Sequence, residues 1–227
     1  MKCLITAGPT YEPVDQVRRL TNFSTGRLGG ELADYLVSQG HKVHLLLAEM
    51  ATWNGPACAR TEERFSTTAD LRARLERLRG NDVDAVFHAA AVSDFTPAGV
   101  WKRGPAGELR PVRAGKIPSH LDSLFLELRP TLKIIACLRA WFPMAVIIGW
   151  KYEVDGTRGE AIARGGSQIQ ACQTSVCVVN GPAYGPGFGV VGADGRAHHQ
   201  ADAAALYAAL LRLALNPPTR VAGPGNR

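Results

Sequence analysis

Residues 2–40, KCLITAGPTYEPVDQVRRLTNFSTGRLGGELADYLVSQG, decide the fold. Lys2–Ala7 is a mainly apolar run that predicts a buried strand, and Gly8-Pro9-Thr10 ends it. From Leu28 to Leu36 the apolar residues recur at helical spacing, and Gly40 closes that segment. The chain therefore opens with a strand, a long loop and a helix.

Strands and helices continue to alternate along the chain. Apolar runs predict strands at residues 41–48, 84–91, 144–150 and 176–180, and residues 123–129 alternate as a half-exposed strand would. Helices are expected at residues 68–78, behind the cap Thr67, and at residues 131–141, 159–171 and 201–215. Gly165-Gly166 weakens the middle of the helix at 159–171. Ala193-Asp194-Gly195 marks a hairpin turn.

This order predicts one α/β domain over residues 1–216, with a doubly wound, Rossmann-like, mainly parallel sheet. Ligands are then expected at the carboxyl ends of the strands. Residues 96–115 are rich in Gly, Pro and Arg and lack periodicity, which predicts a structureless flexible flap over that edge. Residues 217–227 carry three prolines and are expected to form a disordered tail.

Composition restricts the partners. Lys and Arg number 26 against 20 Asp and Glu, so the net charge of +6 suits an anionic partner. The basic residues are dispersed, which favours phosphorylated small molecules over nucleic acid. Five cysteines without a C-x-x-C pair fit reduced thiols, and neither a leader nor an apolar stretch of about 20 residues is present. A cytoplasmic protein with no membrane partner is expected.

The loop after the first strand offers groups that suit a phosphate chain. Gly8 and Thr10 lie at the strand end, and Ser24-Thr25-Gly26 open the next helix, where backbone N–H groups and the helix dipole attract anions. Any strand-to-helix turn also uses such residues. Asn22 is either a helix cap or a donor to a carbonyl or acyl-phosphate oxygen, and the residues alone leave both open.

Three further segments carry candidate site residues. Ala89-Ala90-Ala91 let a ligand approach the backbone, and Asp94 is a cap or a contact to a metal, ribose or ammonium. Trp150 packs in the core or stacks on a nucleobase. The glycine-rich loop 180–189 can close over the base or sugar. The flap cations suit either a triphosphate or solvent: Lys102, Arg103, Arg110, Arg113 and Lys116, against the single acid Glu108.

Taken in order, five segments resemble phosphopantothenoylcysteine synthetase, the synthetase domain of the pantothenate-metabolism flavoprotein family, in its stand-alone form. They are residues 5–29, 88–95, 115–135, 149–155 and 178–189. The resemblance implies a Rossmann-like homodimer and a ligase of coenzyme A biosynthesis. In that family the carboxylate of 4'-phosphopantothenate attacks the α-phosphate of CTP or ATP with Mg²⁺, and cysteine's amine then displaces the nucleotide from the acyl nucleotidylate.

The resemblance also assigns roles by position. Asn22 holds the acyl intermediate beside the backbone of Ala90 and Ala91, and Lys116 is the flap lysine that reaches the phosphates. Arg18 joins Asn22 and Ala91 in binding the acid. The nucleotide is expected to contact Gly8, Thr10, Ser24, Thr25, Gly26, Ala89, Ala90, Ala91, Asp94 and Trp150. Metal ligands stay unassigned, and no flavin is expected.

The chain departs from bacterial relatives, which carry several flap lysines and two lysines at the positions of Gln168 and Cys172. Those losses leave CTP against ATP open and motivate one rival reading, a nucleotide-binding module without turnover. A second rival, a NAD(P)-dependent reductase, would use Glu49 on a ribose, but G-x-G-x-x-G and a Tyr followed four residues later by Lys are absent.

Overall fold

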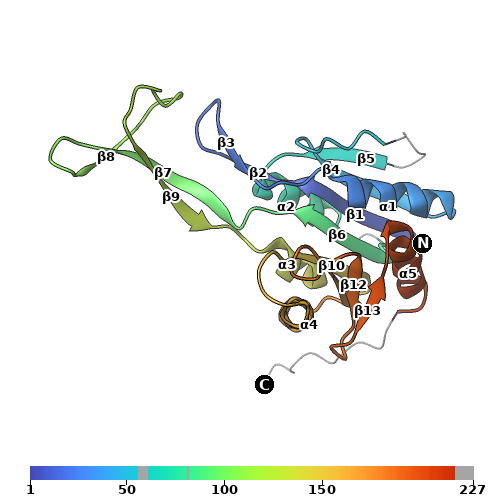
Figure 1. Ribbon diagram of the computed structural model, residues 1–227. Coiled ribbons are helices and arrows are strands. Elements are labelled where there is room, and N and C mark those ends of the chain that lie inside the picture. The colour runs from blue at the N-terminus through green and yellow to red at the C-terminus, as the bar shows by residue number, and fades with distance from the viewer. Residues whose placement is uncertain (56–60, 81, 218–227) are drawn as a thin grey trace, which may run out of the picture.

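A computed structural model describes residues 1–55, 61–80 and 82–217. Its centre is an eight-stranded sheet in the order β13-β12-β11-β10-β6-β1-β4-β5 (Figure 1). All pairings from β5 to β11 are parallel, and β12 and β13 add antiparallel. The strands are β1 (Lys2–Pro9), β4 (Lys42–Ala48), β5 (Thr61–Phe65), β6 (Ala85–Ala91), β10 (Val146–Tyr152), β11 (Val176–Asn180), β12 (Phe188–Val191) and β13 (Ala197–Gln200).

Helices cover both faces of this sheet, so the doubly wound Rossmann-like prediction is confirmed. One face packs against α1 (Arg27–Ser38) and α5 (Ala203–Leu215). The other packs against α2 (Thr68–Arg77), α3 (Ile134–Trp141) and α4 (Arg158–Cys172). Within β1, Ile5 joins the first core and Leu4 the second, because successive side chains of a strand point to opposite faces.

Local signals position the helices largely as predicted. The Thr67 side chain caps α2, and α4 begins with a capping box between Thr157 and Glu160. The predicted helix at residues 159–171 is α4, which continues without a break through Gly165-Gly166. A Cβ on Gly165 would lie 2.7 Å from a methyl of Val179, so this glycine lets α4 pack tightly on β11.

The segment after β6 corrects the prediction of a structureless flap. β7 (Phe95–Arg103), β8 (Leu109–Pro111) and β9 (Leu124–Pro130) form a three-stranded antiparallel sheet. The half-exposed strand predicted near residue 123 is therefore β9, which pairs with β7 instead of joining the central sheet. Figure 1 shows this small sheet projecting away from the central one, next to the hairpin of β2 (Tyr11–Pro13) and β3 (Arg19–Thr21).

Two further expectations concern the tail and the membrane. Apart from Pro217, the predicted tail lies outside the described residues. In the part of the chain that the structure describes, no helix is both long and apolar enough to cross a membrane.

Candidate active site

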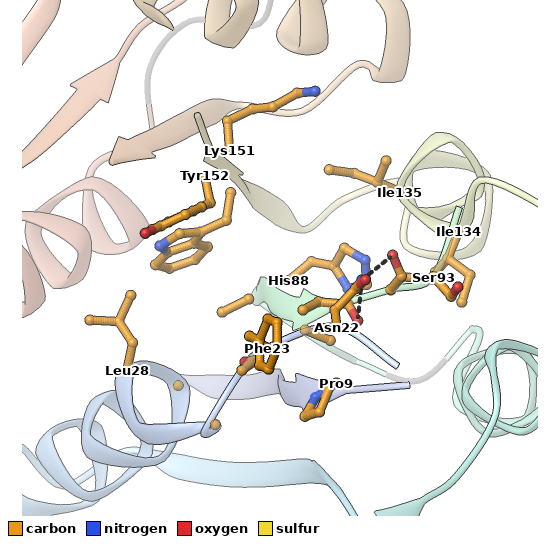
Figure 2. A pocket seen from close by; sticks show the side chains of 18 of the residues that line it. Pro9, Asn22, Phe23, Leu28, His88, Ser93, Ile134, Ile135, Lys151 and Tyr152 are labelled. Atoms are coloured by element: carbon orange, nitrogen blue, oxygen red, sulfur yellow. Dashed lines mark hydrogen bonds between the residues drawn. The ribbon is translucent and has the colours of Figure 1, made fainter. Parts of the chain in front are cut away.

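A cavity of about 940 Å³ opens at the carboxyl ends of the parallel strands. The chain adds β4 and β5 on one side of β1, then crosses to β6 on the other, and ligands of doubly wound sheets bind at such a reversal. Pro9 at the end of β1 and Ala89–Ala91 at the end of β6 both line the cavity. Figure 2 shows its walls, with Leu28 from α1 and Ile134 and Ile135 from α3 around the strand ends.

The amino end of α1 forms one wall. Ser24, Thr25 and Gly26 all line the cavity, and Gly26 is the N-cap with φ +76° and no capping side chain. A Cβ on Gly26 would lie 2.9 Å from the Cβ of Ala51, so both conformation and space require glycine. The Arg27 N–H donates to Thr25 Oγ1 at 3.2 Å, while the N-cap residue Gly26 makes no capping bond. The helix dipole and the amino end of α1 therefore face the cavity, a geometry that suits a phosphate.

Asn22 joins this wall to the end of β6. Its Nδ2 donates to the carbonyl oxygens of Ala91 at 3.4 Å and Val92 at 3.3 Å (Figure 2). Both bonds are near the long limit for a hydrogen bond, so a ligand oxygen can compete for these N–H groups. The structure therefore places the Asn22 amide inside the cavity, beside the backbone of Ala91.

Asp94 also lines the cavity, and the loop that carries it is braced from two sides. The N–H of Ser93 donates to Thr10 Oγ1 at 2.8 Å, and the N–H of Thr131 donates to the Asp94 carbonyl at 2.9 Å. This bracing leaves the Asp94 side chain exposed on a fixed backbone.

His88 forms part of the floor and was not selected as a site residue from the sequence. Its side chain is buried, and Nδ1 lies 2.8 Å from Thr6 Oγ1. Burial lowers the pKa of His88 to about 4, so the imidazole is neutral at neutral pH. Its position inside an apolar strand concealed it, although strand ends at this edge were the predicted site.

Three cations at the cavity were also missed: Arg27, Lys133 and Lys151. Lys133 is the N-cap of α3 and makes no capping bond, so the amino end of a second helix meets the cavity with a cation beside it. Lys151 lies 3.9 Å from Glu153, and Arg27 pairs with Glu31 at 2.5 Å. Lysine is a poor N-cap, and that mismatch was the available signal.

Two buried polar atoms at the cavity lack a partner among the described residues: Trp150 Nε1 and Gln168 Oε1. Gln168 Nε2 donates to the Trp150 carbonyl at 3.3 Å, which fixes the orientation of the amide. Cys172, the other position at which the resemblance leads us to expect a lysine in relatives, is buried in the core between the sheet and α3. Of these two positions, only Gln168 borders the cavity.

Four predicted residues do not line this cavity: Gly8, Thr10, Arg18 and Lys116. Gly8 is buried with φ +85°, and a Cβ there would lie 2.8 Å from the Cβ of Ala48, so it shapes the turn.

The Thr10 hydroxyl is fully buried between Thr68 and Ser93 and is inaccessible to a ligand. Arg18 lies at the tip of the β2–β3 hairpin, and Lys116 lies next to that tip in the segment between β8 and β9. The other predicted residues, including Asn22, Asp94 and Trp150, come together at one cavity.

Comparison with known proteins shows the family of this chain. The family described as the DNA/pantothenate metabolism flavoprotein C-terminal domain matches residues 1–191. The coenzyme A biosynthesis bifunctional protein CoaBC of Thermococcus kodakarensis is 29% identical over 180 residues, covering 79% of this chain and 41% of that protein. The Bacillus subtilis protein of the same name is 31% identical over 188 residues, covering 82% and 42%.

The fold agrees as well. The crystal structure of the DNA/pantothenate metabolism flavoprotein from Streptococcus pneumoniae superimposes with a TM-score of 0.83 at 25% identity, covering 95% of this chain and 99% of that one. This chain spans less than half the length of the two curated relatives. The match covers most of the chain, so the protein belongs to the DNA/pantothenate metabolism flavoprotein C-terminal domain family, the phosphopantothenoylcysteine synthetases.

Proposed function

We propose that this protein is a ligase that joins 4'-phosphopantothenate to cysteine through an acyl nucleotidylate, with CTP or ATP as co-substrate. The observation that carries the proposal is the cavity at the β1–β6 reversal, which unites the Asn22 amide, Asp94 and the amino ends of two helices. Amide donors suit an acyl oxygen, and helix ends suit phosphates. Family membership supports the same reaction class.

In the first proposed step, a carboxylate oxygen of the acid attacks the α-phosphorus of the nucleotide. The new C–O–P link forms as the bond to pyrophosphate breaks, and pyrophosphate leaves. The amino end of α1, with Ser24 and Thr25, is placed to hold the phosphates, while Lys133 at α3 offers a positive charge to them. Fixed donors of this kind stabilise charge that develops on the phosphate oxygens.

In the second proposed step, the amine of cysteine attacks the acyl carbon. The nucleoside monophosphate leaves, and the amine loses a proton as the amide forms. Negative charge develops on the acyl oxygen, and we propose Asn22 Nδ2, which lies beside the backbone of Ala91 in the cavity, as its donor. The two long bonds of that amide would be exchanged for one to the acyl oxygen.

We propose that Mg²⁺ binds at this site together with the phosphates of the nucleotide. The described residues contain no cluster of three His, Cys, Asp or Glu side chains that could hold a metal ion. Asp94 and Glu153 line the cavity, but Glu153 pairs with Arg164 at 2.5 Å, so Asp94 is the carboxylate that we propose for the ion. Mg²⁺ commonly uses one or two carboxylates with substrate phosphates, and bound there it would neutralise phosphate charge. Trp150 remains our proposed neighbour of the base, and the choice between CTP and ATP is left to the assay.

We also propose that the protein is a homodimer formed through the small sheet. Leu124, Leu126 and Leu128 alternate along β9 and are 46%, 37% and 41% exposed, so one face of the sheet offers unpaired apolar surface. A second copy of this chain is the proposed occupant, and Leu126→Lys should convert a dimer into a monomer in light scattering. A wild-type monomer would refute it.

A cytoplasmic location is proposed from the thiols. The described cysteines are free: Cys3, Cys137, Cys172 and Cys177. Burial raises the pKa of Cys3 to about 11 and that of Cys177 to about 12, so both behave as inert core residues. Such thiols suit a reducing compartment.

The rival reading, a nucleotide-binding module without turnover, rests on Gln168 and Cys172. Burial raises the pKa of the Cys172 thiol, and the positive charges of Lys133 and Lys151 act on it in the opposite direction. Both lysines also line the cavity, so α3 and β10 offer it positive charge that α4 lacks at the two positions where the resemblance leads us to expect lysine. These two charges favour the reading with turnover.

One assay separates the readings. The protein is incubated with 4'-phosphopantothenate, cysteine, Mg²⁺ and either CTP or ATP, and pyrophosphate is followed. Release that depends on phosphopantothenate supports the ligase. Nucleotide binding without release would instead support the module, and a response to NADPH alone would support the reductase.

A further inference from the structure

The tip of the β2–β3 hairpin holds the segment 115–117, which we call the flap base. The N–H of Gln16 donates to the Gly115 carbonyl at 2.9 Å, and the N–H of Ile117 donates to Asp15 Oδ2 at 3.0 Å. Arg18 Nη1 donates to the Ile117 carbonyl at 3.1 Å. Both polar groups of the Ile117 backbone are therefore bound by one ion pair.

Asp15 is the centre of this arrangement, and its side chain is only 1% exposed. Its Oδ1 accepts from the N–H groups of Val17 at 2.8 Å and Arg18 at 2.7 Å, and its Oδ2 also accepts from Arg18 Nη1 at 2.5 Å. The Ile117 N–H makes the largest contribution to lowering the pKa of Asp15 to about 2, despite an opposing desolvation effect. The carboxylate is thus ionised throughout the pH range of an enzyme assay.

Lys116 lies between the anchored groups. The peptide before it is held through the Gly115 carbonyl and the peptide after it through the Ile117 N–H. Ile117 itself is 3% exposed, whereas Lys116 is exposed. Among the residues that the structure describes, the Lys116 ammonium forms no hydrogen bond or ion pair. Its backbone is fixed while its side chain stays available.

We infer that Asp15, together with Arg18, is a positioning residue that acts through Lys116. The inference rests on the proposed ligase reaction and on the role at the phosphates that the family resemblance gives to Lys116, which does not itself line the cavity. The hairpin tip forms hydrogen bonds to the flap base on both sides of this lysine, so we expect the hairpin and the Lys116 backbone to move together. Loss of the Asp15 charge would free the Lys116 backbone and reduce the fraction of molecules with the ammonium in place.

The test uses Asp15→Asn, which keeps the shape of the side chain. In either orientation its NH₂ group faces N–H donors, because both carboxylate oxygens accept only such groups. We expect hydrogen exchange at the Ile117 amide to become at least about tenfold faster. A hydrogen bond to a charged acceptor typically contributes more than the free energy that corresponds to a tenfold change in an equilibrium constant. Amides in β1 and β6 should stay unchanged. Asp194→Asn is the matched control: Asp194 also accepts a backbone N–H in a turn and pairs with Arg196.

Activity supplies the second readout. Asp15→Asn should lower pyrophosphate release about tenfold, and it should have no further effect in a Lys116→Met background. Unchanged exchange at Ile117, or additive losses in the double variant, would overturn the inference. An inactive wild type would refute the ligase reaction and with it the catalytic part of the inference, while exchange at Ile117 would still decide whether the anchor exists.

Discussion

Replacing Asn22 by aspartate tests the proposed second step. The Nδ2 atom of Asn22 faces the carbonyl oxygens of Ala91 and Val92 at 3.4 and 3.3 Å. In Asn22→Asp an oxygen takes the place of this donor, so the acyl oxygen loses its hydrogen bond. The new carboxylate also repels both carbonyl oxygens.

The size of the effect follows from the donor that is lost. Removing one donor to a developing oxyanion slows catalysis by about 10²–10³-fold. The present bonds are long, which places Asn22 at the lower end, so we expect amide formation to slow about a hundredfold. Pyrophosphate release should slow less than about fivefold, because other groups hold the phosphates in the first step.

Single-turnover quench experiments that follow pyrophosphate and amide in the same samples separate the two rates. Asn216→Asp is the matched control, since Asn216 Nδ2 also donates to a backbone carbonyl, that of Arg212, at 3.4 Å, but lies at the end of α5. If the two rates fall equally in Asn22→Asp, or if amide formation stays normal, Asn22 does not act on the acyl oxygen.

Three further variants test other parts of the account. Burial lowers the pKa of His88 from 6.5 to about 4, so between these pH values the imidazole binds a proton only in the unfolded chain. Between pH 7 and pH 4 the wild type should therefore lose about 3 kcal/mol more unfolding free energy than His88→Gln. Equal losses for the two proteins in urea titrations would contradict this. Lys133→Met should weaken nucleotide binding about fivefold in calorimetry, with a smaller effect at high salt, and an unchanged affinity would remove Lys133 from the site. Gly29→Ala places a Cβ 2.6 Å from that of Ala7 and should cost about 1–3 kcal/mol of stability, which a normal melting temperature would refute.

The central sheet was predictable because most of its strands are apolar on both faces and because capping side chains mark the starts of α2, α4 and α5. β1, α1 and the later strands follow from patterns only a few residues long. β5 was missed, since TEERF at the sheet edge buries only Phe65 fully. β7 was also missed: FTPAGVWKR contains Pro and Gly, and its order comes from pairing with distant β9.

The site was predicted in part for the same reason. Asn22 lies in the connection from β1 to α1 and Asp94 lies just after β6, and the carboxyl ends of these two parallel strands are neighbours in the sheet. His88 was missed because it lies inside an apolar strand, and Lys133 was missed because a lysine at a helix start is only a weak signal. The anchor between Arg18 and Ile117 joins residues 99 positions apart, and no local pattern carries information on such a contact.

The most direct test of the acyl nucleotidylate follows a labelled oxygen. Phosphopantothenate carrying ¹⁸O in its carboxylate is turned over with cysteine, Mg²⁺ and CTP or ATP, and the released nucleotide is analysed by mass spectrometry. Attack on the α-phosphate predicts one ¹⁸O in the nucleoside monophosphate for each amide formed. Label in inorganic phosphate, with a nucleoside diphosphate as product, would contradict the account.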